Sequence, residues 1–339
     1  MSILVTGGAG YIGGHMVLAL LDAGEKVVVL DNLSTGFRWA IPPGAVFVEG
    51  DVGDRALVAE ILAKHGIEAI AHFAAKIVVP ESVIDPLAYY LNNAAKARDL
   101  IDCAVKAGIK QFIFSSTAAI YGEPSVSPIL EDVVPAPINP YGRSKLMVEW
   151  MLADADRAYG LSTVVLRYFN VAGADPRGRL GQSSPVATHL IKIAVQAALG
   201  HRNGMEVFGT DYPTPDGSCV RDYIQVTDLV AAHLQALAYL RAGGKSITCN
   251  CGYGRGLSVL EIVDVVKSVS GVDFPVRIVG RREGDPPSLI ADATRVREVL
   301  GWHPRHEDVR GMVKQAMDWE RRLHNVGSPN GDELSYTHP

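Results

Sequence analysis

The sequence predicts an α/β protein built on a doubly wound parallel sheet, followed by a smaller α/β lobe. In the first half of the chain, short apolar runs rich in β-branched residues alternate with longer segments of helical periodicity. The runs are almost continuously apolar, as expected for parallel strands that are covered by helices on both faces. A glycine-rich turn directly follows the first run, as in doubly wound folds that bind nucleotides.

The elements of the first half can be placed in chain order. The expected strands lie at 3–6, 26–30, 45–49, 68–73, 111–115 and 162–168, and helical patterns lie near 12–23, 54–65, 84–107 and 141–159. Because a helix separates successive strands, the connections are expected to be right-handed crossovers between parallel strands.

The pattern changes beyond about Asn170, where loops rich in Gly, Pro and Asp separate further helices and short strands. We therefore expect residues 1–170 to form the larger domain, with later segments around 222–252 returning to it, and residues 171–325 to form the smaller lobe. Residues 326–339 contain few apolar residues and many turn formers, so a disordered tail is expected.

Composition excludes several classes of protein. With 339 residues and a net charge of −5, the chain carries no overall positive field for nucleic acid or an anionic membrane. It has neither a signal peptide pattern nor the roughly 20 apolar residues in a row that would span a bilayer. The four cysteines, Cys103, Cys219, Cys249 and Cys251, suit a reducing cytoplasm. Cys249 and Cys251 lack a second ligand pair, so no metal is expected.

The turn GGAGYIGGH after the first strand fits a phosphate-binding loop. Gly8, Gly10 and Gly13 match G-x-G-x-x-G, and Gly7, Gly10 and Gly13 match G-x-x-G-x-x-G. In either frame, glycines let backbone N–H groups approach a pyrophosphate at the positive end of the helix that begins near Tyr11. An ordinary glycine-rich turn is the alternative, but the position between a strand and a helix favours a dinucleotide site.

Asp31 ends the second strand at the spacing expected for a ribose-binding carboxylate. It lies 18 residues after Gly13 and can accept hydrogen bonds from both ribose hydroxyls while repelling a 2′-phosphate. The sequence therefore favours NAD over NADP. The alternative for Asp31 is a turn former before Asn32. Asp51 and Val52, after the third strand, lie where an adenine could bind, although turn chemistry also explains the carboxylate.

The stretch NPYGRSK places Tyr141 and Lys145 on one helix face. Asn139 can cap the helix and Pro140 suits its first turn, so Tyr141 and Lys145 fall at positions i and i+4. An ammonium beside the phenol would lower its pKa from about 10 toward that of a usable general base. Such spacing also arises by chance, but Thr117 at the end of the fifth strand could orient the reacting oxygen.

Taken together, these motifs resemble the extended short-chain dehydrogenase/reductase family and, within it, the NAD-dependent epimerases of UDP sugars. The resemblance covers about residues 1–320. It is carried, in the family's order, by VTGGAGYIG, DNLSTG, EGD, HFAA, PLAYYLNN, FIFSSTAAIYG, NPYGRSKLMVE, LRYFNVAGA, VRDYIQVTDL and REGDPPSLIAD.

The resemblance implies a Rossmann-type NAD-binding domain, a nucleotide-sugar-binding lobe and a reaction without net redox change. The 4-hydroxyl of UDP-glucose or UDP-galactose would be oxidised, the 4-keto sugar would turn over in the site, and reduction would follow from the opposite face. Tyr141 would remove the proton, Lys145 would hold the nicotinamide ribose and tune Tyr141, and Thr117 would bind the reacting oxygen. A cytoplasmic homodimer acting in galactose metabolism is implied.

The resemblance also implies two sets of contacts. The cofactor contacts are Gly7, Gly10, Tyr11, Ile12, Gly13, Asp31, Asn32, Ser34, Asp51, Val52, Phe73, Ala74, Ala75, Asn92, Lys145, Tyr168 and Phe169. The substrate contacts are Thr117, Tyr141, Asn170, Phe208, Arg221, Arg282 and Asp285. Two separated arginines suit a diphosphate, although surface arginines are usually solvated and a phenylalanine is usually core.

Two positions depart from the family's pattern. Lys76 lies one position before the place where many members carry a lysine near the cofactor phosphates, and Ile77 occupies that place. Leu289 lies where the family has a large aromatic or a small residue that limits pocket size. Because leucine is intermediate in size, acceptance of N-acetylated sugars stays open.

Other functions remain to be weighed. A sugar 4,6-dehydratase would carry an acidic pair after the strand-five threonine, but Ala118 and Ala119 follow Thr117 here. Epimerases of UDP-N-acetylglucosamine, UDP-glucuronate or a UDP-pentose stay possible. A net dehydrogenase would change added NAD(H) with turnover. A nucleotide-sensing module would have lost Tyr141 or Lys145.

The helices near 84–107 and 141–159 could form a dimer interface or simply a monomer core.

Overall fold

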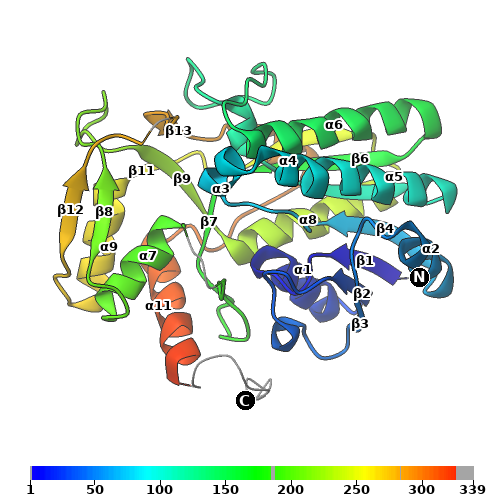
Figure 1. Ribbon diagram of the computed structural model, residues 1–339, viewed down its shortest axis with the longest axis horizontal. Helices are drawn as coiled ribbons and strands as arrows, with labels where there is room; N and C mark the ends of the chain where they lie inside the picture. Colours follow the sequence, from blue (N-terminus) through cyan, green and yellow to red (C-terminus); the bar gives the residue numbers. More distant parts are fainter. Residues whose placement is uncertain (1, 185–187, 283, 326–339) are drawn as a thin grey trace.

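The computed structural model describes residues 2–184, 188–282 and 284–325. In this part of the chain a seven-stranded sheet has the order β10-β6-β5-β4-β1-β2-β3, and every adjacent pair is parallel. This sheet confirms the predicted doubly wound fold (Figure 1). Its strands are β1 (Ser2–Thr6), β2 (Lys26–Asp31), β3 (Val46–Glu49), β4 (Ile67–His72), β5 (Gln111–Thr117), β6 (Ser162–Tyr168) and β10 (Ile247–Cys251).

Helices cover both faces of the large sheet. One face carries α1 (Tyr11–Asp22) and α8 (Val226–Arg241), and the other carries α2 (Arg55–Lys64), α5 (Lys96–Lys106) and α6 (Pro140–Tyr159). Because side chains alternate along a strand, Ile3 and Val5 of β1 enter one core while Leu4 enters the other. Burial on both faces explains why these strands are continuously apolar.

The segment near 84–107 differs from the single helix that its periodicity predicts. It divides into α4 (Pro86–Tyr89), a π-helical segment (Tyr90–Ala95) and α5, after a preceding short helix α3 (Val79–Ile84). In the π-helical segment, the Asn93 amide bonds both backbone polar groups of Lys76 and the Ser144 hydroxyl. This tertiary contact joins the segment to α6, and sequence periodicity cannot reveal it.

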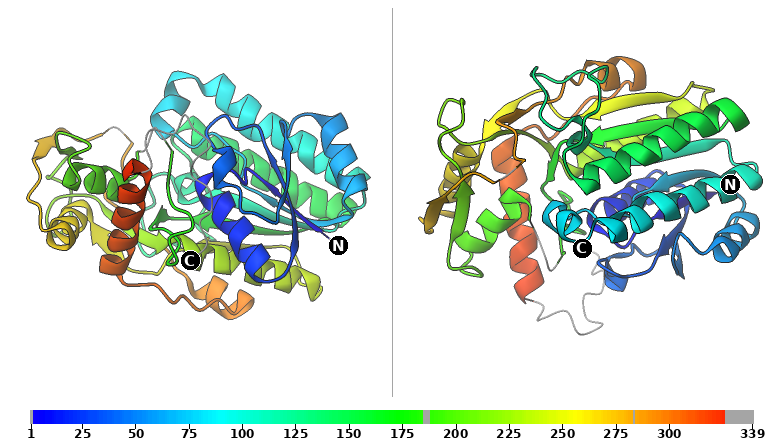
Figure 2. Two further views of the ribbon diagram at one scale, coloured as in Figure 1. Left: turned by 90° about the horizontal axis from the view of Figure 1, so that it is seen from below. Right: turned by 45° about the horizontal axis from the view of Figure 1, so that its top comes forward.

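The smaller lobe lies beside the end of the large sheet where its strands finish, as both views of Figure 2 show. The short strands β7, β11 and β13 flank β9, and β8 pairs with β12. Helices α7, α9 and α11 form a common apolar core with these strands. The elements are β7 (Asn170–Ala172), α7 (Leu190–Ala198), β8 (Met205–Phe208), β9 (Val220–Gln225), β11 (Gly256–Ser258), α9 (Val259–Ser270), β12 (Val276–Val279), β13 (Ser288–Leu289) and α11 (Val309–Asn325).

Between β9 and β11 the chain returns to the large sheet, where α8 covers one face and β10 adds the edge strand beside β6. Helix α10 (Thr294–Leu300) packs against this same region. The 3-10 helices lie at Arg38–Ala40 and Ala118–Tyr121. Residues 222–252, which were expected to return to the larger domain, contain most of β9, in the smaller sheets, and then α8 and β10, which pack on the large sheet.

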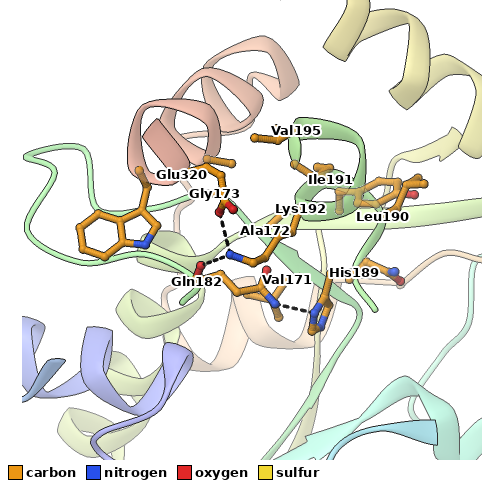
Figure 3. A pocket seen from close by; sticks show the side chains of 14 residues that line it. Val171, Ala172, Gly173, Gln182, His189, Leu190, Ile191, Lys192, Val195 and Glu320 are labelled. Carbon is orange, nitrogen blue, oxygen red and sulfur yellow. Dashed lines mark hydrogen bonds and ion pairs between the residues drawn. The ribbon is translucent and has the colours of Figure 1, made fainter. Parts of the chain in front are cut away.

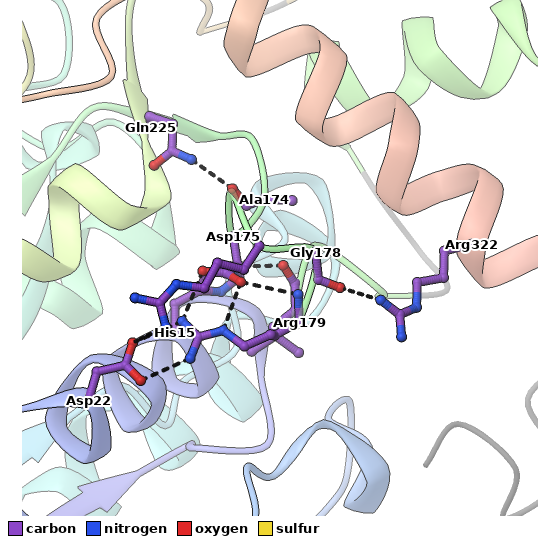
Figure 4. Close-up of polar contacts among 10 residues, drawn as sticks. His15, Asp22, Ala174, Asp175, Gly178, Arg179, Gln225 and Arg322 are labelled. Carbon is purple, nitrogen blue, oxygen red and sulfur yellow. Dashed lines mark hydrogen bonds and ion pairs between the residues drawn. The ribbon is translucent and has the colours of Figure 1, made fainter. Parts of the chain in front are cut away.

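A loop that follows β7 joins the smaller lobe to α1 through polar contacts (Figure 4). Arg179 makes two 2.9 Å bonds to the carboxylate of Asp22 in α1, and it also bonds the buried Asp175 within the loop. The Tyr11 hydroxyl donates to Gly173 O at 2.7 Å. The helix behind the glycine turn is therefore held by side chains from the second half of the chain.

Two expectations concern the chain as a whole. All four cysteines lie among the described residues, and each is buried and free. No helix in the described ranges is long and apolar enough to cross a membrane. The predicted disordered tail at 326–339 lies outside the described residues.

Candidate active site

The glycine turn closes tightly against the strand next to it. Gly7 adopts a φ of +74°, and a Cβ there would lie 2.6 Å from the backbone nitrogen of Ala74. A Cβ on Gly13 would lie 2.2 Å from the carbonyl oxygen of Gly7. Helix α1 begins after Gly10 without a side-chain cap among the described residues. A cradle that side chains would fill, at an uncapped helix start, fits a dinucleotide pyrophosphate.

Asp31 lies beside this turn at the carboxyl end of β2. Its carboxylate accepts from the Ala9 backbone N–H at 2.9 Å and from the Leu33 N–H at 2.8 Å. Burial raises the pKa of Asp31, and these two backbone bonds oppose the rise. The carboxylate is thus fixed against the glycine turn, which suits contact with a ribose.

Asp51 has a cationic partner that the sequence did not indicate. Lys96 Nζ donates to Asp51 at 2.6 Å, and Asn32 Nδ2 donates to it at 3.1 Å. Burial raises the pKa of Asp51, but the hydrogen bonds from Lys96, Gly53 and Asn32 outweigh it and the net pKa is lowered. Lys96 lies in α5, far along the chain, so only the fold brings the two charges together.

Tyr141 and Thr117 meet at the carboxyl end of β5. Asn139 caps α6 by accepting from the Gly142 N–H at 2.8 Å, which begins the helix just before Tyr141. Burial raises the pKa of Tyr141 above 10.0, while a side-chain hydrogen bond with Thr117 lowers it. The pKa of Tyr141 is therefore raised overall, whereas the spacing with Lys145 predicted that it would be lowered. Burial of the phenol outweighs its polar contacts within the chain.

Lys145 is buried one helical turn after Tyr141. Its Nζ donates to Ser115 O at 2.7 Å and lies 4.9 Å from the centre of the Phe114 ring. Burial lowers the pKa of Lys145 from 10.5 to about 7, and the Glu149 carboxylate acts in the opposite direction. The lysine can therefore gain or lose its charge near neutral pH.

Two further predicted residues, Phe73 and Tyr168, contact a histidine that the sequence did not single out. The Tyr168 hydroxyl hydrogen-bonds His233 Nε2, and the Phe73 ring lies 5.0 Å from the His233 ring. Burial lowers the pKa of His233 to about 4, so this imidazole is neutral at pH 7. His233 comes from α8, and no local motif marks it.

Ile77 occupies the position where many members of the family carry a lysine. Ile77 is half exposed, and Lys76 Nζ donates to Glu81 at 2.7 Å. Asn92, which was predicted, donates to the side chain of Asn93, which was not. The paired asparagines in LNN were the sequence signal that could have identified Asn93 as well.

The predicted substrate residues of the smaller lobe fall into two groups. Arg221 is buried and donates to Asp285 at 2.8 Å, and the Arg282 guanidinium lies 4.1 Å from the centre of the Phe208 ring. Each arginine is therefore held by another residue of the predicted set. Asp222, beside Arg221, accepts from Ala291 N at 3.2 Å and so ties β9 to the segment after β13.

Asn170 lines a pocket with residues that the sequence did not identify, drawn in Figure 3. The His189 ring bonds the Gln182 amide at 2.6 Å. The Lys192 ammonium donates to Gln182 O and to Glu320, at 2.6 and 2.7 Å. These polar groups converge beside the start of β7, next to the end of β6, and they extend the candidate site into the smaller lobe.

Leu289 lies close to the carboxyl end of β5. It packs against a buried cluster that includes Ala118, Phe169 and Ala291. The remaining predicted residues are placed as follows. Val52 and Phe169 are buried, Ile12, Ala74 and Ala75 are partly buried, and Ser34 is exposed and donates its N–H to Asn32.

Comparison with known proteins supports the chemistry suggested by this geometry. Residues 3–252 match the NAD dependent epimerase/dehydratase family. A UDP-glucose 4-epimerase of Azospirillum brasilense is 55% identical over 333 residues, which cover 97% of this chain and 96% of that protein.

Two solved structures are also similar. The UDP-glucose 4-epimerase of Brucella ovis in complex with NAD has a TM-score of 0.91 and 46% identity, covering 94% of this chain and 97% of that one. The UDP-glucose-4-epimerase of Stenotrophomonas maltophila, with bound NAD and formylated UDP-arabinopyranose, has a TM-score of 0.93 and 39% identity, covering 96% and 100%.

Proposed function

Because the chain belongs to the NAD dependent epimerase/dehydratase family, we propose that it interconverts UDP-glucose and UDP-galactose. The observation that carries the proposal is the meeting of Tyr141, Thr117 and Lys145 at the end of β5, in the sheet whose glycine turn fits a dinucleotide. The curated relative with this activity covers almost the whole chain.

NAD is the cofactor, and the residues that would hold it belong to the large sheet. The glycine turn and the start of α1 would bind the pyrophosphate, and Asp31 would accept the ribose hydroxyls. The other proposed contacts are those predicted from the sequence. Bound in this way, NAD would supply the hydride acceptor and donor for C4 of the sugar, so the reaction would need no second substrate.

In the proposed mechanism, Tyr141 takes the proton of the 4-hydroxyl as a general base and returns it at the end. Thr117 hydrogen-bonds Tyr141, and in this proposal its hydroxyl orients the sugar oxygen. The Lys145 ammonium favours the phenolate form of Tyr141 that accepts this proton, and this charge matters because burial alone raises the pKa of Tyr141. The residues Ala118 and Ala119 supply no acid for elimination, which separates this reaction from dehydration.

The proposed sugar site lies in the smaller lobe. Arg221 and Arg282 would bind the diphosphate, with Asp285, Phe208 and Asn170 around the nucleotide and sugar. Leu289 packs beside Ala118 and Phe169, and in this proposal its side chain limits the size of the sugar pocket. We propose that this pocket admits hexoses and that N-acetylated sugars fit less well.

The test is an assay of the purified protein with UDP-galactose, UDP-N-acetylgalactosamine and UDP-arabinose side by side. We expect UDP-glucose to form from UDP-galactose without a net change in the absorbance of NADH. Inactivity on UDP-galactose with turnover of another UDP sugar would transfer the proposal to that sugar. Steady accumulation of NADH would show a dehydrogenase instead.

We also propose that the enzyme is a cytoplasmic homodimer. Free, buried cysteines suit a reducing compartment. Leu87, Leu91 and Trp150 are 76%, 60% and 60% exposed on helical segments that pack together, and monomers rarely expose such a patch. Light scattering should give the mass of two chains, and Leu87→Lys with Leu91→Lys should give one.

A further inference from the structure

Three successive residues of β5 contact three successive turns of α6. Ser115 O accepts from Lys145, the Ser116 hydroxyl donates to Glu149, and Thr117 hydrogen-bonds Tyr141. Tyr141, Lys145 and Glu149 are four residues apart along the helix and therefore share one face. Glu149 belongs to this face, yet nothing in the proposed mechanism uses it.

Glu149 is a buried carboxylate with a fully engaged partner. Arg167 of β6 donates to it twice, from Nη2 at 2.7 Å and from Nε at 3.2 Å, and both side chains are less than a tenth exposed. Arg167 also donates to the Tyr121 hydroxyl at 2.8 Å and to Glu131 O at 3.1 Å. A buried ion pair adds little to the free energy of unfolding by itself. Stability therefore does not explain why this pair lies beside the helix that carries Tyr141 and Lys145.

We propose that Glu149 is a positioning residue that keeps Lys145 charged and oriented for the reaction, and that Arg167 limits the strength of this effect. The inference rests on the proposed function, because it assigns a purpose to the charge of Lys145. Glu149 holds α6 against β5 through Ser116, next to the carbonyl that receives Lys145. Its negative charge favours the ammonium form of Lys145 in a site where burial disfavours it.

The other groups near Lys145 do not supply this charge. From β4, His72 hydrogen-bonds Thr6, and burial lowers its pKa to about 3, so it is neutral. From β5 come the neutral Phe114 ring and Ser115 O.

The phenols near Lys145 are also neutral. Tyr168 of β6 is a buried phenol whose pKa is raised, and the pKa of Tyr141, on α6 itself, is raised as well. Arg167 is a cation that is paired with Glu149.

The test compares two neutral substitutions, Glu149→Gln and Arg167→Gln, across a range of pH. In Glu149→Gln the unpaired Arg167 cation remains, so Lys145 should lose its proton more easily. We expect the alkaline limb of the kcat profile to move to lower pH by about one unit. In Arg167→Gln the unopposed carboxylate remains, and the limb should move to higher pH.

A merely structural role makes a different prediction. Both single substitutions leave a buried charge without its partner and should lower stability similarly, as urea unfolding would show. Loss of packing alone would reduce kcat in both without moving the limb in opposite directions. The inference would be overturned if the alkaline limb of the kcat profile stays where it is in the unchanged protein. It would also be overturned if the limb moves in the same direction in both variants.

Three more variants keep the test decisive. If a single variant does not fold, the double variant Glu149→Gln with Arg167→Gln removes both charges of the ion pair, and its limb should move down by less than one unit. Glu149→Asp retains the charge and should recover most of the original profile. Ser116→Ala removes a hydrogen bond to Glu149 but no charge, so it should leave the limb in place.

A titration of Lys145 separates this inference from the proposed function. The side-chain nitrogen signal of Lys145, observed by NMR in protein with isotope-labelled lysine, reports its protonation without any substrate. Opposite shifts of this titration in Glu149→Gln and Arg167→Gln would support the inference even if no UDP sugar reacts. Turnover of UDP-galactose with an unshifted titration would instead retain the function and reject the role of Glu149.

Discussion

At the scale of single residues, the site combines groups whose charges are set by burial. Lys145 is buried and Tyr141 is partly buried, and the loss of solvent opposes the charged form of each. When a phenolate and an ammonium are both present, their opposite charges stabilise each other in this environment. Either charge alone would lack a partner. The pair therefore suits proton transfer better than its separate pKa values indicate.

Removing the phenolic oxygen should abolish most activity. For Tyr141→Phe we expect kcat to fall by about 10² to 10⁴, the usual contribution of a general base. Bound NAD should be retained, because the substitution does not touch the glycine turn. Tyr159→Phe, on the same helix but 61% exposed, is the matched control and should behave like the original protein. Near-normal turnover of Tyr141→Phe would refute the assignment.

Asp31 should determine the choice of dinucleotide. In Asp31→Asn, loss of the charged acceptor should weaken NAD binding by about 10- to 100-fold, since hydrogen bonds to charged groups contribute about 1.5–3 kcal/mol. NADP binding should change less, because a repulsive charge is also removed. Calorimetric titration of both dinucleotides checks this, with Asp273→Asn as a surface control. Equal weakening for both would argue against ribose contact.

At the scale of elements, α6 matters most because its first turn carries the base. The Asn139 cap and Pro140 fix where the helix begins, and the left-handed Gly160 ends it. Residues on one face then meet β5 in register, as the contacts of Lys145 and Glu149 show. An error in the helix start would displace Tyr141 from Thr117.

The cap should therefore affect both stability and rate. Asn139→Ala removes the acceptor for the Gly142 N–H and should lower the free energy of unfolding by about 1 kcal/mol. The value of kcat should also fall, because the first helical turn frays at Tyr141. Asn139→Asp keeps a capping oxygen and should retain both properties. Urea unfolding together with the epimerase assay measures the two effects, and identical behaviour of the two variants would contradict this role.

At the scale of the whole molecule, polar contacts join the loop after β7 to helix α1. Arg179 of this loop bonds Asp22 of α1, and the Tyr11 hydroxyl at the start of α1 donates to Gly173 O. We propose that the large sheet, with α8 and β10, forms the NAD-binding domain and that residues 171–325 otherwise form the sugar-binding lobe. Closure of the site would then depend on the contacts between the lobes.

Buried neutral histidines should make the fold sensitive to acid. Burial lowers the pKa of His72 to about 3 and that of His233 to about 4, from 6.5. As pH falls below 6.5, the unfolded chain binds protons that the folded chain refuses. The contribution of these neutral histidines to the free energy of unfolding is thus complete above pH 6.5. It decreases toward pH 4, by at most about 1.4 kcal/mol per pH unit for each histidine.

Urea unfolding between pH 8 and 5 checks this expectation. Asp222 acts in the opposite sense, because burial raises its pKa to about 6 and its contribution is lost as pH rises through that value. The control is His233→Gln, which should be less stable than the original protein at pH 8 but should lose less stability on going to pH 5. An unchanged pH dependence in this variant would contradict the role of His233.

The sequence by itself determined most of the large sheet, because strands buried on both faces are continuously apolar and most of its crossovers contain a helix. The edge strand β10 was not among the predicted strands. It also indicated the glycine turn, Asp31, Thr117 and Tyr141. The backbone geometry around these residues depends on nearby sequence: a strand end, a helix start and a cap. Glycine spacing and the Asn-Pro cap are local signals, and the structure shows both in place.

Only the tertiary structure decided which polar groups meet. The partners Lys96 for Asp51, Arg167 for Glu149 and His233 for Tyr168 come from distant elements. Burial reversed the expected pKa shift of Tyr141, and a side-chain contact through Asn93 accompanies the break of the helix near 84–107. Desolvation and long-range pairing depend on how elements pack, and hydrophobic periodicity records only which face of each element is apolar.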